Sequence, residues 1–200
     1  MTAQKESVVT PERFAQGLTY TQWMEQIDRN KELFVENYDG TTVDPEDTAA
    51  IKALMAKPNG PGKMLAIAEA WCPDVYRGLP AVAKLAEATG LELRIVFRDQ
   101  NMDIMNEFLN KGEFQSVPTV VLYTKDHKYI AYWSERPQLA NEQMPMMREI
   151  TARMRDPELS QEEREKLMQS YQDFQRGPIW GGWRTAAIKE IRQLLEGYAK

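Results

Sequence analysis

This sequence of 200 residues contains one cysteine, Cys72, and one histidine, His127. A lone cysteine excludes an internal disulfide, and with a lone histidine it also excludes a zinc site made of Cys and His ligands from this chain. We therefore expect no metal and no other cofactor, and a reducing, cytoplasmic location. His127 lies in the charged turn 125–128, which predicts a solvated surface side chain.

The chain also lacks an excess of positive charge and long apolar runs. Lys and Arg number 25 against 30 Asp and Glu, a net charge of −5. Because no basic stripe alternates with aromatic residues, we expect no nucleic-acid partner. The apolar runs are far shorter than the roughly 20 residues of a membrane span, and residues 1–10 carry no apolar segment typical of a signal peptide. We expect no membrane association.

The cysteine lies where a predicted strand meets a predicted helix. Residues 64–68 form a short apolar run typical of a buried strand, and a helical pattern follows from Pro73 to Gly90. Its apolar positions are Val75, Leu79, Val82 and Leu85. At a helix N-terminus, unpaired N–H groups and the helix dipole would favour the nucleophilic thiolate. Position alone leaves open the alternative of an inert, buried cysteine.

Two motifs give the chain a resemblance to thioredoxin. Residues 71–74, Trp-Cys-Pro-Asp, resemble the family's Trp-Cys-x-x-Cys signature, and 116–123 resemble its cis-proline loop and the strand that follows. Within that superfamily the chain is similar to a bacterial group with a Trp-Cys-Pro-Asp motif, an Arg-Asp pair (98–99) and an N-terminal helical extension. The resemblance implies Cys72 as candidate nucleophile and, as motif and groove residues, Trp71, Pro73, Asp74, Val75, Val117 and Pro118.

The chain departs from that pattern at two positions. Val75 replaces the second cysteine, so no intramolecular disulfide can release a mixed-disulfide product. Ala66 stands where thioredoxin carries a buried aspartate that assists proton transfer. Acidic and basic residues near Cys72 would shift the pKa of its thiol in opposite directions, and the sequence does not give the sign of the net shift. The candidates for this charge tuning are Glu69, Asp74, Arg77, Arg98 and Asp99.

The resemblance and the hydrophobic patterns together predict an α/β fold. We expect a thioredoxin-like α/β/α sandwich with a central mixed sheet of about four strands and helical extensions at both ends. The expected parts are an N-terminal extension (1–60), a core (61–156) and a C-terminal extension (157–200), packed as one unit. The expected elements are helices at 20–38, from 44, 73–90, 102–111, from 141 and 185–198, a linker at 57–62, and strands at 64–68, 91–97, 119–123 and 129–133.

Other features have simpler interpretations. Residues 60–63, Gly-Pro-Gly-Lys, lack the remaining positions of a phosphate loop and are interpreted as linker. The pair Asp99 and Asp103 is interpreted as helix capping rather than a cation site. Residues 180–183, Trp-Gly-Gly-Trp, are predicted to form a glycine-rich loop whose tryptophans pack on the core, with an interface as the alternative. The methionines of 144–147 are either core filler or an adaptable binding surface.

Two hypotheses of function remain. In the first, Cys72 carries out monothiol thiol-disulfide exchange, or redox-linked binding, with a protein or a low-molecular-weight thiol or disulfide. In the second, the chain is a non-catalytic thioredoxin-fold adaptor that keeps the groove without the chemistry. Glutathione is a doubtful partner, because the glycine pair that glutathione-using relatives carry after the cis-proline strand is absent there. A homo-oligomer is possible.

Overall fold

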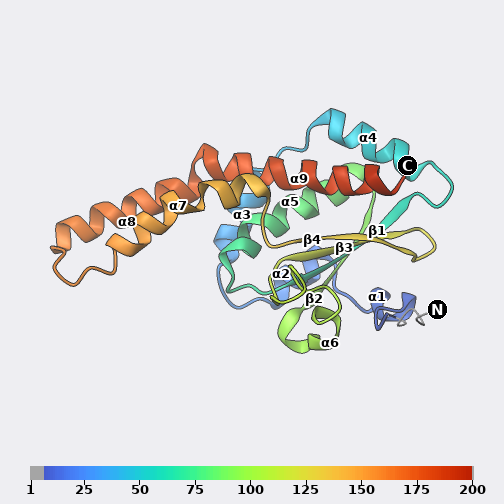
Figure 1. Cartoon of the computed structure of the whole chain (residues 1–200), viewed down its shortest axis with the longest axis horizontal. Helices are drawn as coiled ribbons and strands as arrows, with labels where there is room; N and C mark the ends of the chain where they lie inside the picture. The colour runs from blue at the N-terminus through green and yellow to red at the C-terminus, as the bar shows by residue number, and fades with distance from the viewer. Residues whose placement is uncertain (1–6, 200) are drawn as a thin grey trace.

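A computed structural model describes residues 7–199 of the chain. Figure 1 shows their arrangement, with four strands between helices that come from both ends of the sequence. The elements are α1 (Pro11–Ala15), α2 (Tyr20–Gln26), α3 (Lys31–Asp39), α4 (Pro45–Met55), β1 (Pro61–Ala68), α5 (Pro73–Thr89), β2 (Glu92–Phe97), η1 (Arg98–Gln100), α6 (Met102–Met105), β3 (Thr119–Thr124), β4 (Tyr129–Ser134), α7 (Gln138–Arg153), α8 (Gln161–Arg176) and α9 (Pro178–Tyr198).

The four strands form one mixed sheet in the order β2-β1-β3-β4. β1 pairs parallel with β2 and antiparallel with β3, and β3 pairs antiparallel with β4. Residues 64–68 of β1 are all buried, as expected for a central strand covered on both faces. The predicted four-stranded mixed sheet is confirmed.

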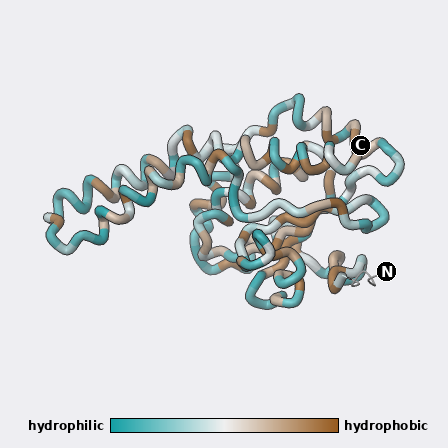
Figure 2. Tube along the Cα trace, viewed as in Figure 1, coloured by the Kyte–Doolittle hydropathy of each residue, from teal (hydrophilic) through white to brown (hydrophobic). Residues whose placement is uncertain are grey.

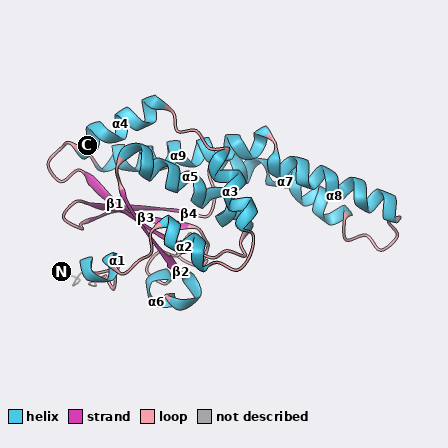
Figure 3. Cartoon of the chain, turned by 180° about the vertical axis from the view of Figure 1, so that it is seen from behind, coloured by secondary structure: helices cyan, strands magenta, loops and turns pink. Residues whose placement is uncertain are grey.

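Helices cover both faces of this sheet. In Figures 1 and 3, α4, α5 and α9 lie on one side, and α1, α2 and α6 lie on the other. Figure 2 shows hydrophobic residues concentrated along the strands between these layers. Because each element buries an apolar face against the next layer, the chain forms a single core, and the predicted α/β/α sandwich is confirmed.

Helix α5 positions the cysteine, and its ends follow from the sequence. Pro73 occupies the first helical position, where the missing N–H costs no hydrogen bond. Gly90 ends the helix in the left-handed conformation with φ of 87°, which glycine adopts without strain. Almost every residue from Val75 to Ala86 is buried, because α3 and α9 pack on the helix from the side away from the sheet.

Helices α7 and α8 form a hairpin that projects beyond the rest of the molecule (Figure 1). Ser160 and Glu163 form a capping box that starts α8. Figure 2 shows the projecting part as largely hydrophilic. Within the methionine-rich stretch, Met147 is buried and Met146 is 44% exposed, so the stretch is divided between core and surface.

Three predicted boundaries before β3 are wrong. The helix predicted over 20–38 is two helices, because Asn30 adopts a left-handed conformation and donates a side-chain hydrogen bond to Ala70 O at 2.8 Å. β1 begins at Pro61, inside the predicted linker, because Pro61 and Lys63 already pair with β3 across a bulge. The helix predicted over 102–111 ends at Met105, where tighter turn bonds replace the helical ones: Glu107 N donates to Ile104 O and Phe108 N to Met105 O.

The predicted glycine-rich loop at 180–183 is also wrong. These residues lie in α9, which begins at Pro178 and continues to Tyr198 without a break. Trp180 and Trp183 are each 1% exposed and share the inward face with Ile188 and Ile191. Burial of this face outweighs the low helix propensity of two glycines. The prediction that the tryptophans pack on the core is confirmed.

His127 is not the solvated residue that the charged turn predicts. Its ring stacks on Tyr123 with centroids 4.5 Å apart and meets the edge of Phe14 at 5.5 Å. Its Nε2 lies 2.8 Å from Val9 O. The side chain is partly buried because the segment before α1 folds over the β3–β4 turn, a contact that the turn sequence does not encode.

Candidate functional site

Cys72 lies at the junction of β1 and α5, as the N-cap residue of the helix. The sulfur is half-buried, and the thiol donates a hydrogen bond to Val117 O at 3.5 Å. The Val117–Pro118 peptide bond is cis. The structure therefore brings together the two sequence motifs, 71–74 and 116–123. Cys72 and its acceptor Val117 are 45 residues apart in the sequence.

The environment of Cys72 favours the protonated thiol. Burial raises the pKa of Cys72, and the negative charge of Asp74 raises it further. The backbone N–H groups of Asp74 and Val75 and the positive charge of Arg77 oppose this, but they do not reverse it. Because the thiolate is the nucleophile, the expected activation by the helix N-terminus is outweighed.

Asp74 and Arg77 form a buried ion pair one helical turn apart. Arg136, in the segment after β4, approaches the other oxygen of Asp74 at 3.5 Å and also pairs with Glu135. The Arg77 guanidinium lies over the rings of Trp183 and Trp180, 4.6 and 5.2 Å from their centroids. Asp74 thus pairs with two arginines, and two tryptophan rings cover one of them.

The remaining predicted charges form a second cluster around Trp71. Arg98 lies 4.9 Å from the centroid of the Trp71 ring and pairs with Asp99 at 2.6 Å. Glu69 is buried and accepts a hydrogen bond from Asp99 N at 2.9 Å, and burial raises the pKa of this carboxyl group. Trp71 is 45% exposed, so the cluster supports an aromatic surface next to Cys72. Of the predicted charges, Asp74 and Arg77 act on the thiol most directly.

Sequence reasoning missed three residues of this site. Arg136, Trp180 and Trp183 contact the Asp74–Arg77 pair but come from segments far along the chain. No spacing or motif marks them, because their placement depends on how α9 crosses α5. Burial of Arg77, at 4% exposure, requires such partners, and a buried charge cannot be recognised before the helix packing is known.

The two elements of a complete dithiol site are missing from the core. Val75, in the position of a second cysteine, is fully buried, and so is Ala66, in the position of a buried acid. Within residues 7–199, no group of three Cys, His, Asp or Glu side chains is arranged to hold a metal ion. The site therefore offers a single thiol, a carbonyl acceptor and an aromatic surface.

The profile of the Thioredoxin family matches residues 17–155. The chain belongs to the thioredoxin family. This match includes the Cys72 motif, Pro118 and Arg136, whereas α8 and α9 lie outside it. Trp180 and Trp183 are therefore additions to the matched part of this thioredoxin-family chain, and they complete the surroundings of Arg77.

Solved structures show the same fold at low sequence identity. A protein of unknown function from Pseudomonas aeruginosa aligns with a TM-score of 0.60 and 14% identity, over 92% of this chain and 95% of its own. An HIV epitope-scaffold aligns with a TM-score of 0.61 and 16% identity, over 96% and 99%. No functionally curated protein matches the chain. In the described part of the chain, no helix is both long and apolar enough to cross a membrane.

Proposed function

We propose that this protein captures a partner through one mixed disulfide at Cys72 and does not itself release it. The observation that carries this proposal is the position of the thiol. Cys72 is only partly buried, follows the exposed Trp71 and is hydrogen-bonded to Val117 O, with fully buried Val75 one turn further along the helix. The partner is a protein or a low-molecular-weight disulfide. The lone cysteine supports a reducing, cytoplasmic setting.

The chemistry is a single exchange step. The thiolate of Cys72 attacks one sulfur of a partner disulfide, a new S–S bond forms, and the partner's other sulfur leaves as a thiolate that takes up the proton lost by Cys72. Release then requires a second thiol from another molecule, because the chain has no resolving cysteine. The raised pKa of Cys72 makes the step slow at neutral pH.

The motif supports a finer assignment within the family. Trp71, Cys72, Pro73 and Asp74 are followed after the next strand by the Arg98–Asp99 pair, and three helices precede the core beyond α1. These features support placing the chain in the bacterial thioredoxin-like group with a Trp-Cys-Pro-Asp motif. The partner surface would then be the exposed Trp71 and the loop at Pro118.

A non-catalytic adaptor is the second candidate, and a specific observation favours it. Burial and Asp74 both favour the thiol form of Cys72, so the groove could bind partners without covalent chemistry. In that case Trp71 and the Pro118 loop would carry binding, and Cys72 could be replaced without loss.

Titration with dithiobis(nitrobenzoic acid) separates these functions. The wild-type protein should release one nitrothiobenzoate per chain and retain one as an adduct detectable by mass. A Val75→Cys variant should release two and retain none, because its second thiol resolves the adduct. Cys72→Ser should release none. If the folded wild-type protein releases none over hours at pH 8, while the urea-unfolded chain releases one, covalent capture is wrong and the adaptor function replaces it.

A further inference from the structure

The two outer strands of the sheet differ in whether another segment pairs with their outer side. At the β2 edge, Leu18 exchanges two backbone hydrogen bonds with Ile95, each 2.8 Å long, and so covers that strand. At the other edge, β4 is the last strand, and residues 7–199 contain no segment paired to its outer side. β4 contains no charged residue and no proline, the devices that commonly protect an edge strand from pairing.

The register identifies which backbone groups of β4 face outward. Glu135 N donates to Pro118 O at 2.7 Å, so the neighbouring pair Thr119–Ser134 is a non-hydrogen-bonded pair of the antiparallel ladder. Ser134 therefore turns its N–H and C=O away from β3, and by alternation Tyr132 does the same. The C=O of Ser134 accepts from Arg136 N at 3.0 Å, which leaves the N–H of Ser134 and both groups of Tyr132 facing outward.

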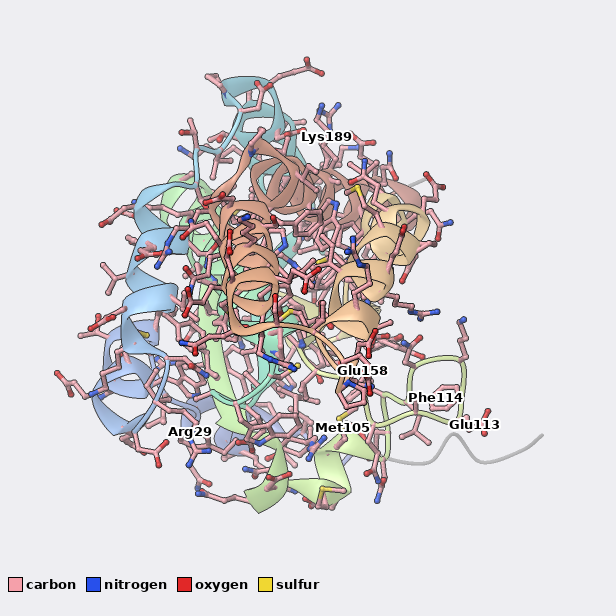
Figure 4. All side chains as sticks on the ribbon, turned by 90° about the vertical axis from the view of Figure 1, so that its left-hand side faces the viewer. Arg29, Met105, Glu113, Phe114, Glu158 and Lys189 are labelled. Carbon is pink, nitrogen blue, oxygen red and sulfur yellow. The ribbon has the colours of Figure 1, made fainter. Side chains whose placement is uncertain are left out.

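A groove of about 540 Å³ lies on this edge. Tyr132, Trp133 and Ser134 all line it. Successive residues of a strand point to opposite faces, so a groove lined by three in a row follows the edge itself. The start of α7 and three residues of α9 form one wall, and Asn110 lies on the other; the α9 residues are Glu190, Gln193 and Leu194. In Figure 4, Lys189 of α9 is labelled at the top, and Phe114, on the loop after Asn110, is labelled at the lower right.

The charged groups that line the groove already have partners within the chain. Arg136 pairs with Glu135 and Asp74, and Glu190 accepts from Trp133 Nε1 at 2.7 Å and from Gln138 N at 2.6 Å. The polar groups that remain are mainly amides, including Asn141 and Gln193. Amides and outward backbone groups match the hydrogen-bonding groups of a peptide backbone, and the carboxylate of Glu190 disfavours an anionic ligand such as a phosphate.

We propose that this groove binds an extended, uncharged peptide segment of another protein as a fifth strand beside β4. The segment would pair with the outward groups of Tyr132 and Ser134, as in other cases of β-strand addition. The walls favour an isolated strand over the edge of a second copy, because a second copy would bring its own α7 and α9 to the same edge. This site is distinct from Cys72 and does not depend on its chemistry.

Ser134 provides a matched pair of variants. Ser134→Pro removes the outward N–H and keeps the bonds to β3, since proline is tolerated at an edge position whose N–H faces outward. Ser134→Ala keeps the N–H and loses the same hydroxyl, which contacts Thr119 Oγ1 at 2.9 Å. Random dodecapeptides should be selected on the wild-type protein, and their affinities should then be measured against both variants and against Cys72→Ser.

We expect the selected peptides to bind wild type, Ser134→Ala and Cys72→Ser equally and Ser134→Pro at least about fivefold more weakly, the effect of one backbone hydrogen bond. Amide NMR signals of Tyr132 and Ser134 should shift on binding. N-methylation of the peptide on alternate residues should abolish binding for one set of positions and not for the other. If Ser134→Pro does not fold, the comparison of the N-methylated peptides decides the result.

Several outcomes would overturn the proposal. The proposal is wrong if no peptide is selected, or if the two sets of N-methylated peptides bind equally well. It is also wrong if the NMR shifts on peptide binding are confined to the Cys72 motif or to α8, or if Cys72→Ser loses peptide binding. A dimer in solution that Ser134→Pro converts to monomer would replace the peptide with a second copy as the occupant.

Discussion

Replacing Arg77 by Met should destabilise the protein by about 3 kcal/mol. Arg77 is 4% exposed and Asp74 is 14% exposed, so the variant leaves a largely buried carboxylate without its nearest cation. Removing one partner of a buried ion pair costs roughly 3–5 kcal/mol, and Arg136 at 3.5 Å from Asp74 places the cost at the lower end. Methionine retains an apolar contact with Trp180 and Trp183, so little packing is lost.

The measurement is thermal unfolding followed by circular dichroism. For a chain of this length, 1 kcal/mol corresponds to roughly 2–4 °C, so Tm should fall by about 6–12 °C. The matched control is Arg29→Met, because Arg29 pairs with Asp28 on the surface with side-chain exposures of 58% and 73%. An exposed pair contributes about 0–1 kcal/mol, and the control should lower Tm by at most about 4 °C.

A double-mutant cycle tests the stated cause. If the uncompensated charge of Asp74 is responsible, Asp74→Asn combined with Arg77→Met should be more stable than the sum of the two single losses predicts, by about 1 kcal/mol or more. Additive effects, or an Arg77→Met variant no less stable than Arg29→Met, would refute the reasoning, because Arg77 would then contribute through packing alone.

Two further predictions concern the thiol. Because burial and Asp74 raise the pKa of Cys72, the folded protein should contain less thiolate at pH 7 than a model thiol of pKa about 8.5. Iodoacetamide should therefore react more slowly with the folded protein than with the model thiol, and Asp74→Asn should accelerate the reaction. A wild-type rate above that of the model thiol would contradict this prediction. Val75→Cys should form an intramolecular disulfide with Cys72 under mild oxidation and should reduce insulin slowly. Adding Ala66→Asp should accelerate insulin reduction and should lower Tm, because it buries a carboxyl group. If no disulfide forms in excess oxidant, the two positions lack dithiol geometry.

The sequence predicts the core of this fold better than its helical additions. The β1–α5 junction and the β3–β4 pair were predictable because short apolar runs, Pro73 and Gly90 are local signals. The prediction of a loop for the tryptophans of α9 is wrong because burial against α5 decides their conformation, and burial is not a local property of the sequence. The same limit applies to His127, whose partners Phe14 and Val9 lie over 100 residues away.

The candidate site divides in the same way. The motif residues and the meeting of Cys72 with the Pro118 loop follow from a resemblance to a known family. The sign of the thiol's pKa shift did not follow, because it depends on how deeply the sulfur is buried and on which oxygen of Asp74 faces which arginine. Distances of a few ångströms decide such electrostatic balances, and sequence spacing does not fix them.

The packing of α9 on α5 has a consequence for synthesis on the ribosome. The guanidinium of Arg77 rests on rings that are translated more than 100 residues later. Until residues 180–183 have left the exit tunnel, the charge beside the thiol lacks its aromatic cover, although all of the sheet is already available to fold. The surroundings of the thiol are thus encoded early and completed late, so a nascent chain would present Cys72 in surroundings that the finished protein does not have.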